Sequence, residues 1–301
     1  MDAGYDAPGD GASTPIRVLA PNPSPMTGPG TNSFLVGRTD LAVIDPGPDL
    51  PAHLDALVAA IAGRPVRAIL VTHPHRDHSP AARPLAARTG APILAFGPPE
   101  AGRSMAMRRL AVSGGDLGGG EGVDAAFQPT RALGDGEAVA GTGWTLIARH
   151  TPGHMGPHLA FVWPEARAAF TGDTVLGWAS TLISPPDGDL DQFLASLDLL
   201  EGLDVDVFHP GHGPAIRDPA HRCQGLRAHR LDREAEILHA LPTAPCIDDL
   251  VARIYDDIPA ALHPAAARNV LAHLVRLERL GRVTATPHPG RDAAWTLRDN
   301  A

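Results

Sequence analysis

With 301 residues, 44% of them hydrophobic, the chain is long enough for one large domain and one small domain with ordinary cores. Its net charge of −9 falls in residues 1–219, which carry 14 Arg against 24 Asp and Glu, whereas residues 220–301 carry 11 against 10. Because sequence-independent affinity for phosphates comes from clustered cations, this acidic body argues against nonspecific nucleic-acid binding unless the C-terminal part or a bound metal provides the attraction.

Two cysteines, Cys223 and Cys246, are too few for a disulfide framework, which favours a reducing compartment. The first residues lack the basic and apolar regions of a signal peptide, and no run of about 18 apolar residues occurs. We therefore expect a soluble cytoplasmic protein with no membrane association.

The first half of the chain alternates strand and helix patterns. Residues 1–15, rich in Gly, Asp and Pro, are expected to form a flexible N-terminus. Strands are predicted at 16–20, 33–36, 41–44, 67–72 and 92–96, and helices at 50–62 and 79–88. This order predicts an α/β fold with helices outside a sheet. Residues 98–128 are glycine-rich and too long for an ordinary connection, and we favour a mobile surface insertion over a substrate-binding lid.

The second half begins with strands and ends with helices. Strands are predicted at 138–140, 144–149, 159–163, 168–170 and 205–208, with a helix at 190–202. Helices at 221–241, 248–255 and 265–280 and a hairpin of 283–286 with 294–297 then describe a small winged-helix domain. We place the boundary near 219, with a catalytic domain over 16–219 and a winged-helix-like domain over 220–301.

Potential metal ligands follow several of these strands. The stretch VTHPHRDHSP at 71–80 holds four of them within six positions, namely His73, His75, Asp77 and His78. Four ligands this close cannot share one helix face or strand face, so a tight loop is expected. Three more follow later strands, namely His154, Asp173 and His212.

Imidazole nitrogens and carboxylate oxygens suit divalent first-row metals, and catalytic zinc usually takes three protein ligands plus water. Two sites with three protein ligands each need six ligands, so seven candidates leave one over unless a carboxylate bridges both ions. Asp173 is the candidate bridge. Two ions about 3.5–4 Å apart can hold a hydroxide between them, with its pKa lowered toward about 7. The residues therefore predict a hydrolase with two Zn²⁺ ions per chain and a metal-bridged hydroxide as nucleophile. This chemistry does not choose between a carbonyl and a phosphodiester centre.

Four motifs resemble in type and order those of the metallo-β-lactamase superfamily, on the glyoxalase II and RNase Z side. They are HxHxDH at 73–78, TPGH at 151–154, GD at 172–173 and GHG at 211–213. The resemblance implies an αββα sandwich with a dinuclear site at its edge. It assigns the first metal to His73, His75 and His154, and the second to Asp77, His78 and His212, with Asp173 bridging. GHG favours His212 over His209. Common β-lactamases have a cysteine where this chain has Asp173, so antibiotic hydrolysis is not expected as the main role.

A narrower resemblance concerns nearly the whole chain. The chain resembles the β-lactamase-like branch whose animal members act as mitochondrial endoribonucleases. The resemblance lies in NSFLVG with LAVIDPG, in GDTVLGWASTLISPPDGDLDQFLASLDLL, in PGHGP and in the winged-helix tail. Single-stranded RNA is therefore the leading substrate, and a small thioester, lactone or other carboxylic ester is the alternative. A nucleic-acid-binding regulator with a vestigial metal site is a third hypothesis, against which the complete ligand set argues.

Some polar residues near the motifs have open roles. His158, four residues after His154, could touch the substrate or donate a proton, so we name it with Asp77 and Asp173 as a catalytic candidate, and an ordinary strand-edge histidine is the alternative. Asp45 could support a ligating histidine. Ser180, Thr181 and Ser184 are expected to line the cleft.

Other polar residues are expected to have structural roles. For Asp187 we favour the start of a turn, and for Asn32 and Ser33 structural capping. In the winged helix, nucleic-acid contact is conceivable, but with a net charge near +1 we favour packing on the catalytic domain as one wall of the cleft, and we expect no DNA-specific binding. The polar residues concerned are Arg268, His273, Arg276 and Arg279.

Overall fold

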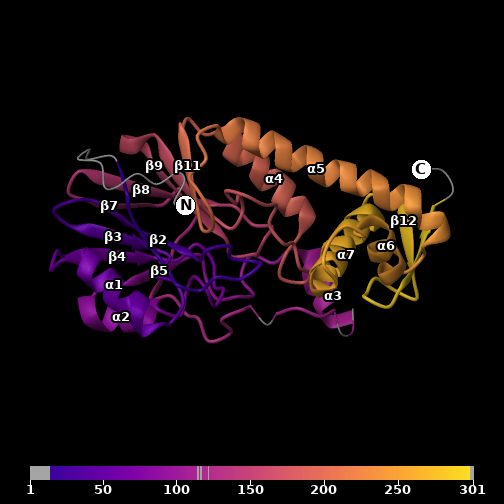
Figure 1. Cartoon of the computed structure of the whole chain (residues 1–301), viewed down its shortest axis with the longest axis horizontal. Coiled ribbons are helices and arrows are strands. Elements are labelled where there is room, and N and C mark those ends of the chain that lie inside the picture. The colour runs from indigo at the N-terminus through magenta and orange to yellow at the C-terminus, as the bar shows by residue number, and fades with distance from the viewer. Residues whose placement is uncertain (1–13, 114, 116, 121, 299–301) are drawn as a thin grey trace.

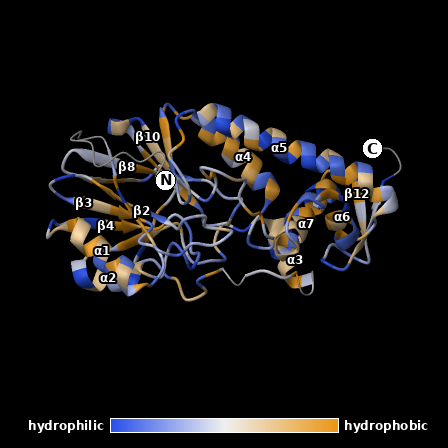
Figure 2. Cartoon of the chain, in the orientation of Figure 1, coloured by the Kyte–Doolittle hydropathy of each residue, from blue (hydrophilic) through white to orange (hydrophobic). Residues whose placement is uncertain are grey.

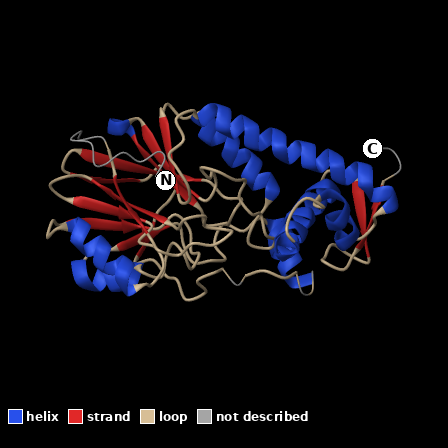
Figure 3. Ribbon diagram, viewed as in Figure 1, coloured by secondary structure: helices blue, strands red, loops and turns tan. Residues whose placement is uncertain are grey.

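The computed structural model describes residues 14–113, 115, 117–120 and 122–298 (Figure 1). The predicted flexible N-terminus therefore lies outside the described residues, except for Thr14 and Pro15. The described strands form two large sheets and one two-stranded sheet, and the large sheets lie at the end of the molecule opposite the C-terminal helices (Figure 3).

The first sheet has six strands in the order β1-β2-β3-β4-β5-β6. They are β1 (Ile16–Leu19), β2 (Asn32–Val36), β3 (Leu41–Ile44), β4 (Val66–Leu70), β5 (Ile93–Ala95) and β6 (Arg131–Ala132). β1 to β3 pair antiparallel, and β3 to β6 pair parallel. Because β3, β4 and β5 run in the same direction, the loops that follow them start from one edge of the sheet.

The second sheet has five strands in the order β11-β10-β9-β8-β7. They are β7 (Ala138–Gly141), β8 (Trp144–His150), β9 (Leu159–Trp163), β10 (Ala168–Gly172) and β11 (Val207–Pro210). β7 to β10 are antiparallel neighbours, while β10 and β11 run parallel. The ends of β8, β10 and β11 therefore lie at one edge of this sheet.

The main core lies between the two sheets, where Phe34, Leu70 and Phe161 are buried. Alternate residues of β4 face opposite ways, so Ile69, and Val71 just after the strand, pack instead against the outer helices α1 (Pro51–Ile61) and α2 (Ala82–Thr89). Helix α4 (Leu190–Glu201) and the first part of α5 (Pro219–Ala240) cover the second sheet. Hydrophobic residues are concentrated in the strands of both sheets (Figure 2). The predicted αββα sandwich is confirmed.

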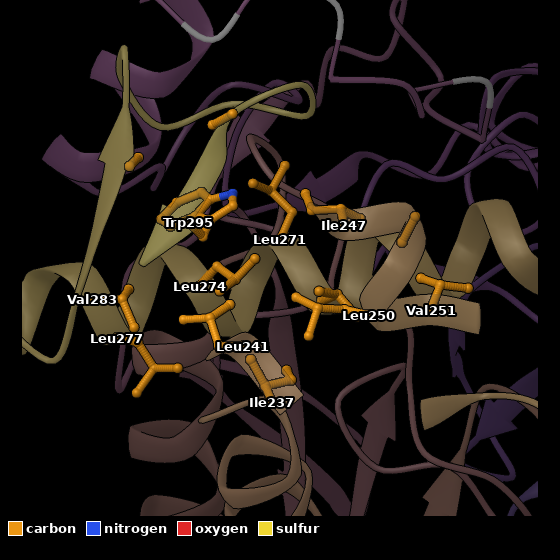
Figure 4. Packing of buried hydrophobic residues seen from close by; sticks show 14 of the residues in the cluster. Ile237, Leu241, Ile247, Leu250, Val251, Leu271, Leu274, Leu277, Val283 and Trp295 are labelled. Carbon is orange, nitrogen blue, oxygen red and sulfur yellow. The ribbon is translucent and has the colours of Figure 1, made fainter. Parts of the chain in front are cut away.

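A separate core holds the C-terminal domain together. It is formed by the end of α5, α6 (Ile247–Ile254), α7 (His263–Arg279) and the wing strands β12 (Val283–Thr286) and β13 (Ala294–Leu297). Trp295 of the wing is fully buried beside Leu271 and Leu274 of α7 (Figure 4). The predicted winged helix is confirmed. Helix α5 belongs to both cores, because Cys223 packs with the catalytic domain and Ile237 with the winged helix.

The segment 98–128 differs from its prediction. It contains helix α3 (Met105–Ser113), and Met107, Leu110 and Leu117 are buried in the core of the winged helix. The prediction of a mobile surface insertion is therefore wrong for these residues. The segment supplies part of the core of a domain whose other core residues begin at Ile237. The short strand β6 was also missed, and β11 begins two residues later than predicted.

Among the described residues, every helix is too short or too polar to serve as a membrane span.

Candidate metal centre

The predicted ligands come together at one edge of the sandwich. The loop after β4 carries four of them, and the loops after β8, β10 and β11 each carry one. Their donor atoms form three overlapping groups, each within 4.8 Å: His73 with His75 and His154, His73 with His78 and Asp173, and Asp77 with His78 and His212. The fold thus assembles residues that are up to 139 positions apart in the sequence.

The first cluster consists of three imidazoles, His73, His75 and His154. Nδ1 of His75 lies 3.0 Å from Nε2 of His73 and 3.0 Å from Nε2 of His154. Burial lowers the pKa of His75 to about 3 and also lowers the pKa values of His73 and His154. At neutral pH all three rings are therefore uncharged, which is the form that binds a metal ion.

The second cluster combines carboxylates with imidazoles. Oδ2 of Asp77 lies 3.1 Å from Nε2 of His212 and 3.4 Å from Nε2 of His78. Burial opposes a charge on His212, but Asp173 and Asp77 outweigh it and raise its pKa to about 10. Without a metal ion, protons therefore hold this cluster together, and a divalent cation would replace them.

Asp173 lies between the clusters. Its Oδ1 is 3.4 Å from Nε2 of His78, and its Oδ2 is 3.3 Å from Nε2 of His212 and 3.9 Å from Nε2 of His154. Burial raises the pKa of Asp173, but His212 and His78 outweigh this effect and hold it well below the usual value. One carboxylate thus reaches ligands of both clusters, as a bridging ligand must.

Acceptors behind the rings orient three of the histidines. Nδ1 of His78 donates to Asp45 at 2.9 Å, Nδ1 of His154 to the Leu182 carbonyl at 2.7 Å, and Nδ1 of His212 to the Gly30 carbonyl at 3.2 Å. Because Nδ1 is bonded to these acceptors, Nε2 of each ring faces its cluster and is the nitrogen that would bind a metal ion. The structure places Asp45 as the predicted support of a histidine, and Asp45 also accepts from the Thr72 N–H at 2.7 Å.

These residues fit two metal ions. Tetrahedral coordination at about 2.0–2.1 Å puts donor atoms roughly 3.3 Å apart. His75 lies 3.0 Å from each of its two partners in the first cluster, the three donor atoms of the second cluster lie 3.1–3.4 Å apart, and every group stays within 4.8 Å. Several lone pairs converge on each of two points, an arrangement that is repulsive unless a cation or a proton lies between them.

The role expected for His158 needs correction. Its ring is fully buried, so it does not reach a substrate. Nε2 accepts from the Asp173 N–H at 3.1 Å, Nδ1 contacts the Thr151 hydroxyl at 2.9 Å, and the ring stacks on His73 with centroids 5.0 Å apart. His158 therefore supports two ligands from behind. His209, the rejected alternative ligand, lies on β11 and stacks on Phe170, outside both clusters.

Residues expected to be structural also lie near the loops. Asn32 donates to the carbonyls of Pro210 at 2.9 Å and Gly213 at 3.0 Å, which holds the loop that carries His212. Ser33 bonds His53 at 2.9 Å, and Asp187 closes a turn on the Ser184 carbonyl at 3.1 Å and pairs with Arg103 at 2.5 Å. The structural roles of Asn32 and Ser33 agree with the sequence-based interpretation. Asp187 forms the favoured turn and also lines the cavity beside the clusters, which was the alternative.

A cavity of about 300 Å³ lies beside the clusters. His75, Asp77, His154, Asp173 and His212 form part of its wall. The rest of the wall includes apolar side chains from three separate loops and one arginine of α7, namely Pro25, Met26, Val123, Leu176, Trp178, Leu182 and Arg268. Ser180, Thr181 and Ser184 also line it, as predicted.

Sequence reasoning missed most of the apolar wall. Trp178 is 48% exposed and Met26 is 46% exposed, although both are large apolar side chains. Trp178 follows the GD motif by five positions, but nothing in its local pattern distinguishes an exposed tryptophan from a core one. Only the tertiary placement of the loops identifies it as part of the cavity.

The winged helix packs on the catalytic domain. Arg276 pairs with Asp191 at 2.9 Å and Arg279 pairs with it at 2.5 Å, while Asn269 accepts from the Ile183 N–H at 3.1 Å. His273 is buried in the same interface region beside Glu234. Together with Arg268 in the cavity wall, these contacts agree with the expected role of the domain as a wall of the cleft.

A four-layer αββα sandwich with two adjoining His/Asp clusters at its edge defines a metal-dependent hydrolase. The chain belongs to the metallo-beta-lactamase superfamily, whose family model matches residues 26–212. A second model, for the beta-lactamase associated winged helix domain, matches residues 246–295. The match agrees with the resemblance seen in the four sequence motifs.

Relatives include proteins that match both domains and proteins that match less of the chain. A beta-lactamase-like protein 2 homolog from Drosophila melanogaster is 30% identical over 285 residues, covering 90% of this chain and 90% of that protein. The homolog from Caenorhabditis elegans is 29% identical and covers 90% of this chain and 86% of that protein. An atrochrysone carboxyl ACP thioesterase from Aspergillus chevalieri is 31% identical over 75% of this chain, which spans 65% of the thioesterase.

Solved structures share the fold. A metallo-beta-lactamase family protein, TTHA1429 from Thermus thermophilus, has a TM-score of 0.75 and 26% identity, with 94% of this chain and 98% of that chain covered. TTHA1623 in a di-iron-bound form has a TM-score of 0.51 and 30% identity, with 71% of this chain and 96% of that chain covered.

Proposed function

We propose that the protein hydrolyses a thioester or related carboxylic ester of a small acyl group. The observation that carries this proposal is the cavity beside the clusters, whose volume of about 300 Å³ and largely apolar wall suit an acyl group. Arg268 is the one arginine among its described lining residues. One guanidinium suits one anionic group of a substrate, whereas an RNA strand presents a phosphate at every nucleotide.

The two clusters supply the ligands for two Zn²⁺ ions in this proposal. His73, His75 and His154 would hold the first ion, and Asp77, His78 and His212 the second, with Asp173 shared. Bound there, the ions would activate water and polarise the attacked carbonyl. The similar TTHA1623 has a di-iron-bound form, so elemental analysis of the purified protein must distinguish zinc from iron.

The groups proposed as catalytic favour a leaving group that needs no proton. Asp77 and Asp173 border the cavity and are the catalytic carboxylates of the proposal, but as metal ligands they would be ionised and would have no proton to donate. His158 is enclosed and neutral because burial lowers its pKa. A thiolate, whose conjugate acid has a pKa of about 8.5, leaves without an acid more readily than an alkoxide does.

The apolar wall and Arg268 would orient such a substrate. Trp178 and Met26 would contact the acyl group, and Arg268, beside Ser184 in the wall, would bind an anionic part of the acyl group or of its carrier. The similarity to an ACP thioesterase supports this reading, since that protein's name describes hydrolysis of a carrier-bound acyl group.

Single-stranded RNA remains the second candidate substrate. The resemblance to the endoribonuclease branch and the position of the winged helix beside the cavity favour it. The net charge of −9 and the apolar wall argue against it. We therefore reverse the order of the two substrate classes that the sequence motifs alone suggested.

The test compares substrate classes on the purified full-length protein. We would measure bound metals, then assay acyl thioesters, lactones and labelled single-stranded RNA with and without a chelator. Thioester turnover that is lost with the chelator and in Asp173→Ala, without RNA cleavage, supports the proposal. RNA cleavage without ester turnover overturns it in favour of the nuclease. A metal-free protein that binds DNA specifically overturns both.

Arg268→Gln tests the anion-binding role. Loss of a hydrogen bond to a charged group, about 1.5–3 kcal/mol, corresponds to a KM raised about 10–100-fold for anionic thioesters, with kcat little changed. Uncharged thioesters should be unaffected. Arg253→Gln in α6, whose guanidinium bonds Thr243 outside the cavity, is the matched control. An unchanged KM for anionic thioesters in Arg268→Gln would remove this role.

A further inference from the structure

Arg230 is a buried cation at the junction of the two domains. It lies on α5, is 2% exposed, and its guanidinium donates to the Thr181 carbonyl and, at 3.3 Å, to Oδ1 of Asn269. The guanidinium also lies 5.4 Å from the centre of the Phe193 ring. Among the described residues Arg230 forms no salt bridge, so its charge is buried against neutral groups.

Burying a charge without an anionic partner is costly, and folding alone does not require it. An apolar residue of similar length at this position would fill the same space without that cost. We therefore look for the role of Arg230 in the groups that it binds, which hold the segment 181–183.

The segment 181–183 is held from both sides. On one side, the Thr181 hydroxyl lies 3.0 Å from Nδ1 of His154 and the Leu182 carbonyl accepts from the same nitrogen at 2.7 Å. On the other side, α5 binds the Thr181 carbonyl through Arg230, and α7 binds the Ile183 N–H through Asn269. Three residues thus connect the winged-helix domain to one metal ligand.

The connection reaches only one of the two clusters. His154 belongs to the first cluster, whereas in the second cluster His78 is oriented by Asp45 and His212 by the Gly30 carbonyl, both from the catalytic domain. The second cluster therefore provides an internal control for any effect that passes through the segment 181–183.

We propose that Arg230 and Asn269 are positioning residues by which the C-terminal domain sets the orientation of His154 and so the metal affinity of the His73–His75–His154 cluster. The groups behind a metal-ligating histidine fix its tautomer and ring orientation, and their loss typically weakens metal binding about 10–100-fold. This role of Arg230 and Asn269 concerns metal binding and is the same whether the substrate is an ester or RNA.

The test measures metal binding by the full-length protein, independently of activity. Arg230→Met and Asn269→Leu are titrated with Zn²⁺ against a competing chelator, and the Co²⁺-loaded proteins are compared by visible absorption. We expect the Zn²⁺ affinity of one of the two sites to fall about 10–100-fold and that of the other to stay unchanged. Asn269→Asp keeps the acceptor oxygen, so its Zn²⁺ affinity should be close to that of the wild type, unlike that of Asn269→Leu.

Arg276→Met is the matched control, because Arg276 joins α7 to Asp191 of α4 at 2.9 Å without touching the segment 181–183. It should bind both ions normally, even if it is less stable. A double variant of Arg230→Met with His154→Ala should bind metal no more weakly than His154→Ala alone, since both changes act through one ligand. Unchanged Zn²⁺ affinities and Co²⁺ spectra in Arg230→Met, equal weakening of both sites, or the same loss in Arg276→Met would each overturn the proposal.

Discussion

Gly211 leaves a space beside the second cluster that an alanine would fill. A Cβ built on Gly211 lies 2.5 Å from Oδ1 of Asp173 and 2.7 Å from Cε1 of His78, whereas ordinary contacts begin at 3.4 Å. Relieving both contacts requires movements of about 0.7–0.9 Å, which is several times the roughly 0.2 Å within which metal–ligand distances must fall. We therefore expect Gly211→Ala to lose tight binding of one metal ion and, since a misplacement of about 1 Å can cost about 100-fold, to lose activity by that factor.

The assay combines metal content after dialysis against a chelator, turnover of the best substrate, and far-UV circular dichroism to verify folding. Gly225→Ala is the matched control, because a Cβ at this position of α5 meets nothing within 4 Å. In that variant we expect full metal content and a gain of about 0.5–1 kcal/mol in stability from the better helix former. A folded Gly211→Ala protein that retains two tightly bound ions and wild-type turnover would refute the reasoning.

Three further changes test the support of the site and the core. Asp45→Asn removes the carboxylate that accepts from His78 at 2.9 Å, so zinc binding at the second cluster should weaken about 10–100-fold in a chelator competition, and unaltered binding would contradict this. Gly153→Ala places a Cβ 2.3 Å from Cα of Phe193 at a φ of +139°, so urea denaturation should show a loss of more than about 2 kcal/mol, and wild-type stability would exclude the contact. Burial lowers the pKa of His273 from 6.5 to about 4, so only the unfolded state takes up this proton as pH falls from 6.5 to 4, and the wild type loses roughly 3 kcal/mol over that range. His273→Leu should lose correspondingly less between urea titrations at pH 7 and pH 4, and parallel losses in both proteins would show that His273 is not held neutral.

Much of the catalytic domain follows from local pattern. Buried strands such as β4 and β10 read directly from apolar runs, and each is followed at once by ligands, so the ligand set and its strand-end positions were predictable. The supporting role of Asp45 could also be predicted, because Asp45 ends a strand beside the expected site. The winged helix was predicted from three helical patterns, with an apolar stripe on the third, followed by a hairpin.

Other features depended on contacts between distant parts of the chain. His158 has the same sequence setting as a catalytic histidine four positions from a ligand, and only its burial behind Asp173 and His73 assigns it a supporting role. The start of β11 was misplaced by two residues, because the apolar run from 205 gives no register, whereas pairing with β10 does.

The ligand chemistry follows from residue types and their order along the chain, since the identities and strand-end positions of seven His and Asp residues define which metals can bind. How the two domains share the site depends on contacts between distant segments. The packing of Met107 and Leu110 in the winged-helix core, and the link from Arg230 through residues 181–183 to His154, join segments that no local periodicity relates. Long-range packing energy, rather than local propensity, places them together.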